Sequence, residues 1–388
     1  MKPKPMILIQ NATILTPHRQ IAGGAVLIEG PRILAVGRTG QATPSSDTRV
    51  IDAGGLWLVP GFIDLQFNGG FGHDFTADPE SIWSVAERLP RFGVTSFLPT
   101  IISSPLDRIS LGQEVVLRQP PGDFAGAIPL GLHIEGPFLN RQKKGAHNPV
   151  YLQPPDLKVV QDWMPSTGVR LVSLAPELPG ALEMIEVLAS HDVLVSAAHS
   201  MASYGETMAA IDAGLRYGTH LFNAMPPLGH RAPGLPGALL TDPRPVVGLI
   251  ADGIHTHPAM ISLVWQILGS RRLNLVTDAM AALGMPAGKH LLGDFDVTVD
   301  QISARLADGT LAGSILSLDQ ALRNLIEIAG CSLSEALPTV TETPARALKI
   351  ESDRGQIAAG YVADLVLLSP ELEVSTTIVE GQIVYEKI

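Results

Sequence analysis

The chain has 388 residues, 46% hydrophobic and only 17% charged, so it can bury a large core and is not a candidate for intrinsic disorder. Its formal net charge of −11 argues against nucleic acid or an anionic membrane as a partner, and an anionic ligand would need a few local cations. With Cys331 as the single cysteine, no disulfide can form within the chain. No stretch approaches the roughly 20 apolar residues that span a bilayer, and the N-terminus lacks a signal-peptide pattern, so we expect a cytoplasmic protein.

The two ends of the chain look alike. Both contain short runs rich in Ile, Val and Leu that are broken by Gly, Pro and Asn, which is typical of strands. Near the C-terminus, Gly381 lies between two such runs, as a hairpin turn requires. We therefore predict that residues 1–57 and 362–388 pair into one small β-sandwich domain.

The middle of the chain, residues 58–361, has a different pattern. Apolar strand-like runs alternate with helix-like stretches such as 79–93 and 180–191. Eight buried strands alternating with helices are typical of an α/β fold of the (β/α)₈ TIM-barrel type. The runs are 61–66, 93–100, 128–136, 169–177, 192–200, 217–224, 245–255 and 273–279.

Unusual polar residues fall repeatedly at the C-terminal ends of these runs. In a barrel those ends converge on one mouth, where active sites are built. The residues are Gln66, Asn68, Glu135, His199, His220, His255 and Asp278.

Glu135, His199 and His220 offer one carboxylate and two imidazoles, a ligand set that is common for catalytic zinc with an open position for water. The alternative is that the histidines are hydrogen-bonded core residues and the glutamate belongs to a buried ion pair. Asp278 suits a general base near an activated water, or alternatively the N-cap of a helix. His133 shares a strand face with Glu135, and we favour a role in the core or behind the ligands.

Several segments carry a resemblance to a known family. They are PGFIDLQFNGGFG, GLHIEGPFLNRQKKGAHNP, SAAHS, THLFNAMPPLGHRAPGLPGA, IADGIH, LVTDAM, GTLAGS and TETPARAL, followed by GQIAAGYVADLVLL. In these segments, which occur in family order and cover essentially the whole chain, the sequence resembles the N-acetylglucosamine-6-phosphate deacetylases of the amidohydrolase superfamily. The combination of HIEGPF, KKGAHNP and HLFNAMPPLGHRAPG is the most specific part.

The resemblance implies hydrolysis of the acetamide of N-acetyl-D-glucosamine 6-phosphate to D-glucosamine 6-phosphate and acetate. It assigns one divalent metal ion, most simply Zn²⁺, to Glu135, His199 and His220, the acid/base role to Asp278, and polarisation of the acetyl carbonyl to His147. It also implies a homodimer in which Arg231 reaches the phosphate in the neighbouring subunit's site. The substrate-binding residues that it implies are Ala146, His147, Asn223, Ala224, Arg231, His255, Leu311, Ala312 and Gly313.

One departure from the wider superfamily concerns the first barrel strand. Many amidohydrolases carry His-x-His there and bind a second metal, whereas this chain has Gln66 and Asn68, and an amide is a poor zinc ligand. This favours a single metal ion, with His73 as an ordinary loop residue. The absence of His-x-His also argues against a cyclic-amide hydrolase, in which this motif is expected. Two alternatives stay open: deacetylation of the galactosamine epimer, and an inactive barrel that acts as a binding or regulatory protein.

Overall fold

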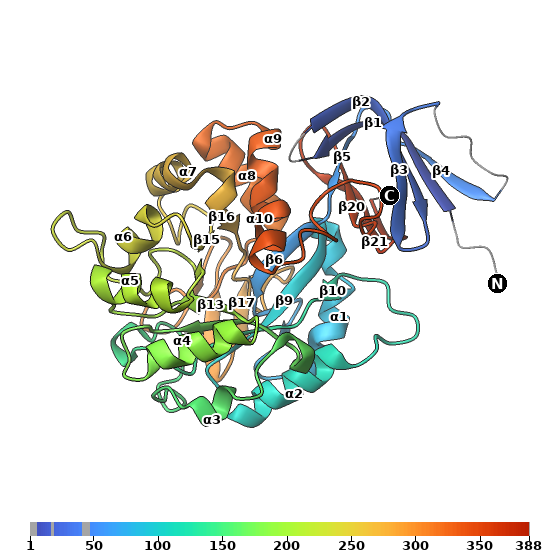
Figure 1. Ribbon diagram of the computed structural model, residues 1–388. Coiled ribbons are helices and arrows are strands. Elements are labelled where there is room, and N and C mark those ends of the chain that lie inside the picture. Colours follow the sequence, from blue (N-terminus) through green and yellow to red (C-terminus); the bar gives the residue numbers. More distant parts are fainter. Residues whose placement is uncertain (1–5, 17–18, 41–46, 388) are drawn as a thin grey trace.

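The structure, a computed structural model, describes residues 6–16, 19–40 and 47–387. It consists of a barrel that carries most of the helices and a sheet built from both chain ends, which lies at one side of the barrel (Figure 1). The first five residues of the predicted terminal domain lie outside the described residues. The barrel with a flanking β domain confirms the predicted fold class.

The terminal domain is one eight-stranded sheet with the order β22-β21-β20-β5-β1-β2-β3, and β4 pairs with β1. Ile and Val side chains of β1 and β2 pack with Leu365 and Leu367 of β20 into a separate core. The turn at Gly381, where φ is 76°, joins β21 and β22 as predicted. The strands are β1 (Met6–Thr16), β2 (Arg19–Glu29), β3 (Arg32–Arg38), β4 (Thr48–Asp52), β5 (Trp57–Pro60), β20 (Leu365–Leu368), β21 (Val374–Val379) and β22 (Gln382–Glu386).

The barrel strands pair in parallel, and most of their residues are buried, which explains the continuous apolar runs in the sequence. The short segment β10 (Ile128–Pro129) pairs only with β9. The sixth strand is shorter than its predicted run, because the chain leaves the sheet after Gly218. The strands are β6 (Phe62–Phe67), β9 (Val94–Ile102), β11 (Leu132–Glu135), β12 (Val169–Leu174), β13 (Leu194–Ala197), β14 (Tyr217–Gly218), β15 (Val246–Leu249) and β16 (Leu273–Leu275).

The barrel closes between its first and last strands through residues that follow β16. Asp278 N donates to Gln66 O over 3.0 Å, and Asn68 N donates to Ala279 O over 2.8 Å. Asp64 and Gln66 on the first strand and Asn68 just after it therefore lie beside Asp278. The closure brings the two ends of the barrel sequence into one site.

Helices cover the outside of the barrel (Figure 1). The helix-like stretch 79–93 is a short α-helix between two 3₁₀ turns, because Pro90 lacks the N–H that a continuing helix needs. None of the described helices is long and apolar enough to cross a membrane. They are α1 (Ile82–Ala86), α2 (Leu106–Leu117), α3 (Leu157–Val160), α4 (Ala181–Ser190), α5 (Tyr204–Ala213), α6 (Gly234–Thr241), α7 (Pro258–Arg272), α8 (Leu318–Ala329), α9 (Leu333–Ala336) and α10 (Glu342–Ala347).

Two small sheets were missed in the sequence. One is the hairpin of β7 (Gly69–Gly70) and β8 (His73–Asp74). The other is the antiparallel sheet of β17 (Gly288–Leu292), β18 (Phe295–Val299) and β19 (Ala304–Arg305), inserted after the last barrel strand. Gly293, with a φ of 55°, forms the turn between β17 and β18. This second sheet matters for function because it lies beside the mouth of the barrel.

The terminal sheet and the barrel share a packed junction. Val59, Val366 and Leu368 of the sheet belong to the barrel's hydrophobic core. At the edge of the junction Arg354 forms ion pairs with Asp364 and Glu380 and donates to Ser96 Oγ in β9. The sheet is therefore fixed to the barrel by apolar packing and by one largely buried arginine.

Candidate active site

A cavity of about 630 Å³ opens at the C-terminal ends of the barrel strands. Side chains from the barrel, from the loop after β11 and from the small inserted sheet form its wall. Its polar lining includes Asn68, Glu135, His147, His199, His220, Asn223, His255 and Asp278. Residues that lie far apart in the sequence thus meet in one cavity, as their positions at the strand ends predicted.

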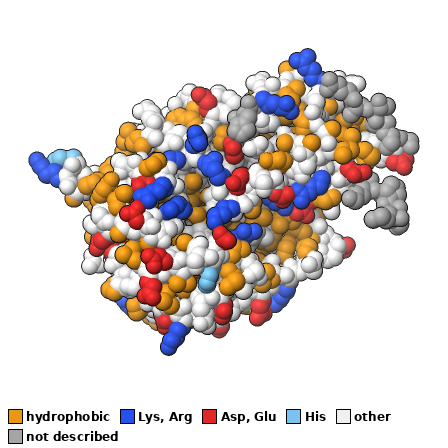
Figure 2. Space-filling model, in the orientation of Figure 1, with side chains coloured by type: hydrophobic (Ala, Val, Ile, Leu, Met, Phe, Trp, Pro, Cys, Tyr) orange, Lys and Arg blue, Asp and Glu red, His pale blue; other side chains and the backbone are white. Residues whose placement is uncertain are grey.

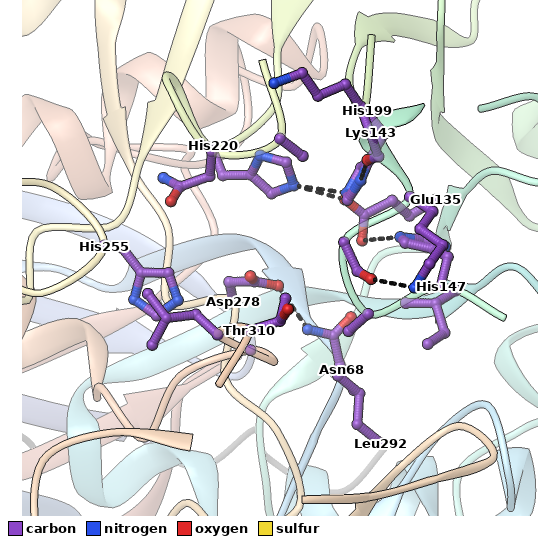
Figure 3. A pocket seen from close by; sticks show the side chains of 18 of the residues that line it. Asn68, Glu135, Lys143, His147, His199, His220, His255, Asp278, Leu292 and Thr310 are labelled. Carbon is purple, nitrogen blue, oxygen red and sulfur yellow. Dashed lines mark hydrogen bonds and ion pairs between the residues drawn. The ribbon is translucent and has the colours of Figure 1, made fainter. Parts of the chain in front are cut away.

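Glu135, His199 and His220 converge on one point at the bottom of this cavity (Figure 3). Nε2 of His220 lies 2.9 Å from Glu135 Oε1 and 3.2 Å from His199 Nε2, and Nε2 of His199 lies 3.3 Å from the same glutamate oxygen. Among the described residues, this is the only group of His, Cys, Asp and Glu side chains that could hold a metal ion. The two histidines face the cavity, so they are not merely core residues.

These separations fit a metal ion. Ligand atoms about 2.0–2.1 Å from a tetrahedral zinc ion lie about 3.3 Å from one another. Nδ1 of His199 is 2.8 Å from the carbonyl oxygen of Lys143, which directs the Nε2 lone pair toward the cluster. Burial raises the pKa of Glu135, but hydrogen bonds with His199 and His220 outweigh burial and hold this pKa well below its ordinary range. The carboxylate is therefore ionised and suited to a cation.

The backbone is strained at two residues of the cluster and at Asp278. His199, His220 and Asp278 all have positive φ, at 46°, 30° and 49°. A residue other than glycine in this region costs about 1–3 kcal/mol, although His and Asp tolerate it better than most. Each residue lies just after a short barrel strand, where the unusual turn directs the side chain over the barrel axis. Such strain is typical of functional sites.

Asp278 faces the cluster from the side of the first strand (Figure 3). Gln66 Nε2 and Asn68 Nδ2 both donate to Asp278 Oδ1, over 3.0 and 2.7 Å, and Gln66 Nε2 also lies 3.3 Å from Glu135 Oε1. The two amides thus hold the aspartate, and its other oxygen stays available for a proton. Burial and the nearby charge of Glu135 raise the pKa of Asp278 to about 6. No helix of the described chain begins beside Asp278, so the N-cap interpretation is wrong.

His147 adds a hydrogen-bond donor to the cavity. The backbone N–H of Ser103 donates to His147 Nδ1 over 3.2 Å, and Ser103 Oγ lies 2.8 Å from the same atom. Because an amide N–H can only donate, Nδ1 must be the unprotonated nitrogen, so the hydrogen sits on Nε2. Burial and the neighbouring His199 lower the pKa of His147 to about 3, so the ring is neutral. The Nε2–H group lies 3.9 Å from Glu135 Oε2.

The other residues expected to bind substrate divide into three groups. Ala146, Asn223, Ala224, His255, Leu311 and Gly313 line the cavity. Ala312 does not line it, because its methyl group is fully buried in a small apolar cluster under β17 and β18. Arg231 is exposed in the segment between β14 and α6, which projects from the body of the molecule, and it does not line the cavity of its own chain (Figure 1).

Two other histidines considered in the sequence, His133 and His73, lie apart from the cavity. His133 is buried inside the barrel, where Nε2 is 2.7 Å from Ser173 Oγ and Nδ1 is 3.3 Å from Thr100 Oγ1. Burial lowers its pKa to about 4. His73 is exposed in the β7–β8 hairpin. Neither belongs to the cluster that could hold a metal ion.

Four cationic side chains that line the cavity were not recognised in the sequence. They are Arg141, Lys143, Lys144 and Arg305, and Lys143 Nζ donates to Met225 O over 2.8 Å. The segment RQKKGAHNP, which contains Arg141 and two adjacent lysines, could have signalled three of them. Arg305 could not be placed from the sequence, because it enters the cavity from the small inserted sheet.

The chain matches the amidohydrolase family over residues 57–384. It is 39% identical to N-acetylglucosamine-6-phosphate deacetylase from Bos taurus, with 98% of this chain and 96% of the relative covered. Identity to the enzyme of the same name from Bacillus subtilis is 35%, with 98% and 97% covered. The chain belongs to the N-acetylglucosamine-6-phosphate deacetylase family.

Solved structures of this deacetylase family share the whole fold. The Pasteurella multocida enzyme superposes with a TM-score of 0.90 at 31% identity, and 97% of this chain and 99% of that chain are covered. A mutant of the Mycobacterium smegmatis deacetylase in complex with N-acetyl-D-glucosamine-6-phosphate gives a TM-score of 0.88 at 35% identity, with 98% and 99% covered. This protein is thus a metal-dependent amidohydrolase of the deacetylase family, with a Glu/His cluster that could hold the metal ion.

Proposed function

We propose that this protein hydrolyses the acetamide of N-acetyl-D-glucosamine 6-phosphate to D-glucosamine 6-phosphate and acetate, in amino-sugar catabolism or recycling. The observation that carries the proposal is the convergence of Glu135, His199 and His220 with Asp278 and His147 on one cavity. Because candidate metal ligands, a general base and a hydrogen-bond donor are all present, an inactive binding barrel is disfavoured.

We further propose that one divalent metal ion per chain, most simply Zn²⁺, is held by Glu135, His199 and His220. Such an ion would supply Lewis-acid activation of water and of the acetyl carbonyl. Gln66 and Asn68 hold Asp278 instead of providing a second set of ligands, which supports a single ion. His73 is exposed and His133 is bonded within the barrel, so neither is available as a replacement.

In this proposal Asp278 acts as the general base and then as the general acid. Its free carboxylate oxygen accepts a proton from the attacking water and later delivers it to the nitrogen of the leaving amine, so that glucosamine 6-phosphate departs with a neutral amine. Burial raises the pKa of Asp278, which makes its carboxylate a stronger proton acceptor than that of an exposed aspartate. The hydrogen bonds from Gln66 and Asn68 fix the carboxylate during both transfers.

His147 stabilises the charge that develops on the acetyl oxygen. Its neutral ring presents the Nε2–H group to the cavity, because Ser103 occupies Nδ1. A donor aimed at a developing oxyanion typically contributes about 10²–10³ in rate. The sugar phosphate would contact Ala146, Asn223, Ala224, His255, Leu311 and Gly313, which line the cavity, whereas the expected contact with Ala312 is not proposed because that residue is buried away from it.

The protein would act as a homodimer in the cytoplasm, with Arg231 of each subunit reaching the substrate phosphate in its neighbour. Arg231 is exposed and lies outside the cavity of its own chain, which supports a role toward another subunit. A guanidinium can bind phosphate oxygens in a bidentate manner.

Acetate release from a panel of N-acetyl sugars tests the proposed function. The panel contains N-acetylglucosamine and N-acetylgalactosamine, each with and without a 6-phosphate. We expect rapid turnover of N-acetylglucosamine 6-phosphate and poor turnover of both unphosphorylated sugars. Faster turnover of the galactosamine epimer would change the substrate assignment, and no turnover of any sugar by metal-loaded protein would support the inactive barrel.

A further inference from the structure

A second cavity, of about 370 Å³, opens at the opposite end of the barrel from the active site. Residues 193–195 at the start of β13 and Val246 at the start of β15 line it, together with Leu348 just after α10. We call it the basal cavity. Lys and Arg side chains gather in the middle of the face shown in Figure 2.

The charge of the basal cavity contrasts with that of the whole protein. The chain carries −11, but the lining of this cavity contains five cations and one carboxylate, which leaves it at +4. The cations are Arg170, Arg216, Arg244, Arg346 and Lys349, and the carboxylate is Asp192.

Two of these cations are already neutralised. Lys349 Nζ lies 2.6 Å from Asp192, and Arg244 pairs with Asp212 and Asp242 over 2.8 and 2.7 Å. The guanidinium groups of Arg170, Arg216 and Arg346 form no ion pair with any carboxylate of the described chain. They are therefore the groups that could attract an anion.

Hydrogen bonds to backbone carbonyls use only some of the N–H donors of Arg170 and Arg216. Arg170 donates from Nε to Leu130 O over 3.1 Å, and Arg216 donates from NH1 to Ile211 O and Leu215 O over 2.6 and 2.8 Å. The bond to Ile211 O caps the last turn of α5, and the bond to Leu215 O lies just beyond the helix. Both terminal nitrogens of Arg170, and Nε and NH2 of Arg216, have no partner among the described residues. Burial lowers the pKa of Arg170, and no carboxylate of the described chain pairs with this half-buried cation.

We propose that the basal cavity binds the phosphate group of a small phosphorylated metabolite, with Arg170 and Arg216 as its anchors. Guanidinium groups bind phosphate oxygens in a bidentate geometry that neither a lysine nor a backbone amide reproduces. The apolar wall of Ala189, Ala347 and Leu348 would contact the uncharged part of the ligand. The volume suits a molecule of about the size of a sugar phosphate, because small-molecule sites begin at about 300 Å³.

Calorimetric titration of the metal-loaded enzyme tests this site, with inorganic phosphate and glucose 6-phosphate as separate probes. All proteins carry Arg231→Ala, which removes the proposed phosphate anchor of the active site. The test variant adds Arg170→Gln and Arg216→Gln, and the glutamine at position 170 keeps a donor at the place of Nε, which donates to Leu130 O. The matched control adds Arg19→Gln and Lys158→Gln, which remove the same charge from exposed positions outside the cavity.

We expect the parent and the control to bind one equivalent per chain, and the test variant to bind at least about a hundredfold more weakly, because two charge-assisted anchors are lost. Tighter binding of glucose 6-phosphate than of inorganic phosphate is expected from the apolar wall. Equal affinity in the test and control variants, or no binding to the parent, would overturn the proposal. If the Gln variant melts at a lower temperature, Arg170→Lys with Arg216→Lys keeps the charge, and undiminished binding by that variant would equally contradict bidentate anchoring.

Discussion

The hydrogen bonds around His147 determine which of its nitrogens can act. Ser103 donates its backbone N–H to Nδ1, so only Nε2 can present a hydrogen to the cavity. The same logic holds for His199, where the Lys143 carbonyl accepts from Nδ1 and leaves the Nε2 lone pair for a metal ion. Two histidines whose rings lie 4.4 Å apart are thus set in opposite tautomers by their backbone contacts.

Replacing His147 by the two amide residues tests this assignment. The amide nitrogen of glutamine in His147→Gln can occupy the position of Nε2, whereas that of asparagine in His147→Asn lies near Nδ1. We expect His147→Asn to lose about 10²–10³ in kcat and His147→Gln to lose clearly less. Steady-state kinetics of both variants measure the difference, and an equal loss would show that the position of the donor is unimportant.

Asp278→Asn should fold and retain its metal ion but lose most deacetylation, by about 10²–10⁴, because an amide cannot exchange the proton at neutral pH. Metal analysis together with acetate release separates the possible roles. Loss of the metal ion would make Asp278 a ligand, and near-normal turnover would exclude it as the base.

Many individual residues of this site could be predicted, because carboxylate and imidazole side chains lie at the C-terminal ends of apolar runs. Glu135, His199, His220 and Asp278 indeed meet in one cavity. The role of Gln66 and Asn68 in holding Asp278 could not be predicted, since it depends on the contact between the first and last barrel strands. Ser103 was missed for the same reason, as a hydroxyl in a strand-to-helix connection carries no signal by itself.

At the scale of elements, the barrel strands were predictable because burial on both faces makes them continuously apolar. The sixth strand was predicted too long. Only Tyr217 and Gly218 pair in the sheet, and the chain leaves it before His220. The sheet of β17, β18 and β19 was missed although Gly293 and Asp294 between two β-rich runs are a hairpin signal. As a result Leu292 and Arg305 were not recognised as part of the cavity wall.

The loop between β14 and α6 contains Arg231, which we propose binds the substrate phosphate. Arg231→Ala should severely reduce turnover of the 6-phosphorylated sugar while barely changing the poor turnover of the unphosphorylated one, because only the former offers oxygens for bidentate binding. Acetate release from both sugars measures the selectivity. An equal loss on both would exclude a phosphate contact.

A mixture of Arg231→Ala and Asp278→Asn subunits tests whether the contact crosses between subunits. A hybrid dimer would contain one site with both an intact base and an intact arginine, so some activity should return. Absence of rescue in verified heterodimers would place Arg231 in the site of its own subunit.

At the scale of the whole molecule, the junction between the terminal sheet and the barrel depends on Arg354, which is 10% exposed and bonds to both parts. Arg354→Ala should lower the free energy of unfolding by about 3–5 kcal/mol, because Asp364 would be left buried without its partner. The matched control is Arg49→Ala, which breaks a pair with Glu386 that is about half exposed and should cost less than about 1 kcal/mol. Denaturant unfolding compares the two, and similar losses would show that the junction does not depend on this ion pair.

We propose that one metal ion, held by Glu135, His199 and His220, enables this barrel to deacetylate N-acetylglucosamine 6-phosphate. Titrating metal-depleted protein with Zn²⁺ while following acetate release from this substrate tests it most directly. We predict that activity rises from near zero and reaches its plateau at one equivalent per chain, and that Glu135→Ala shows no such rise. A plateau only at two equivalents, or full activity without any added metal, would contradict the account.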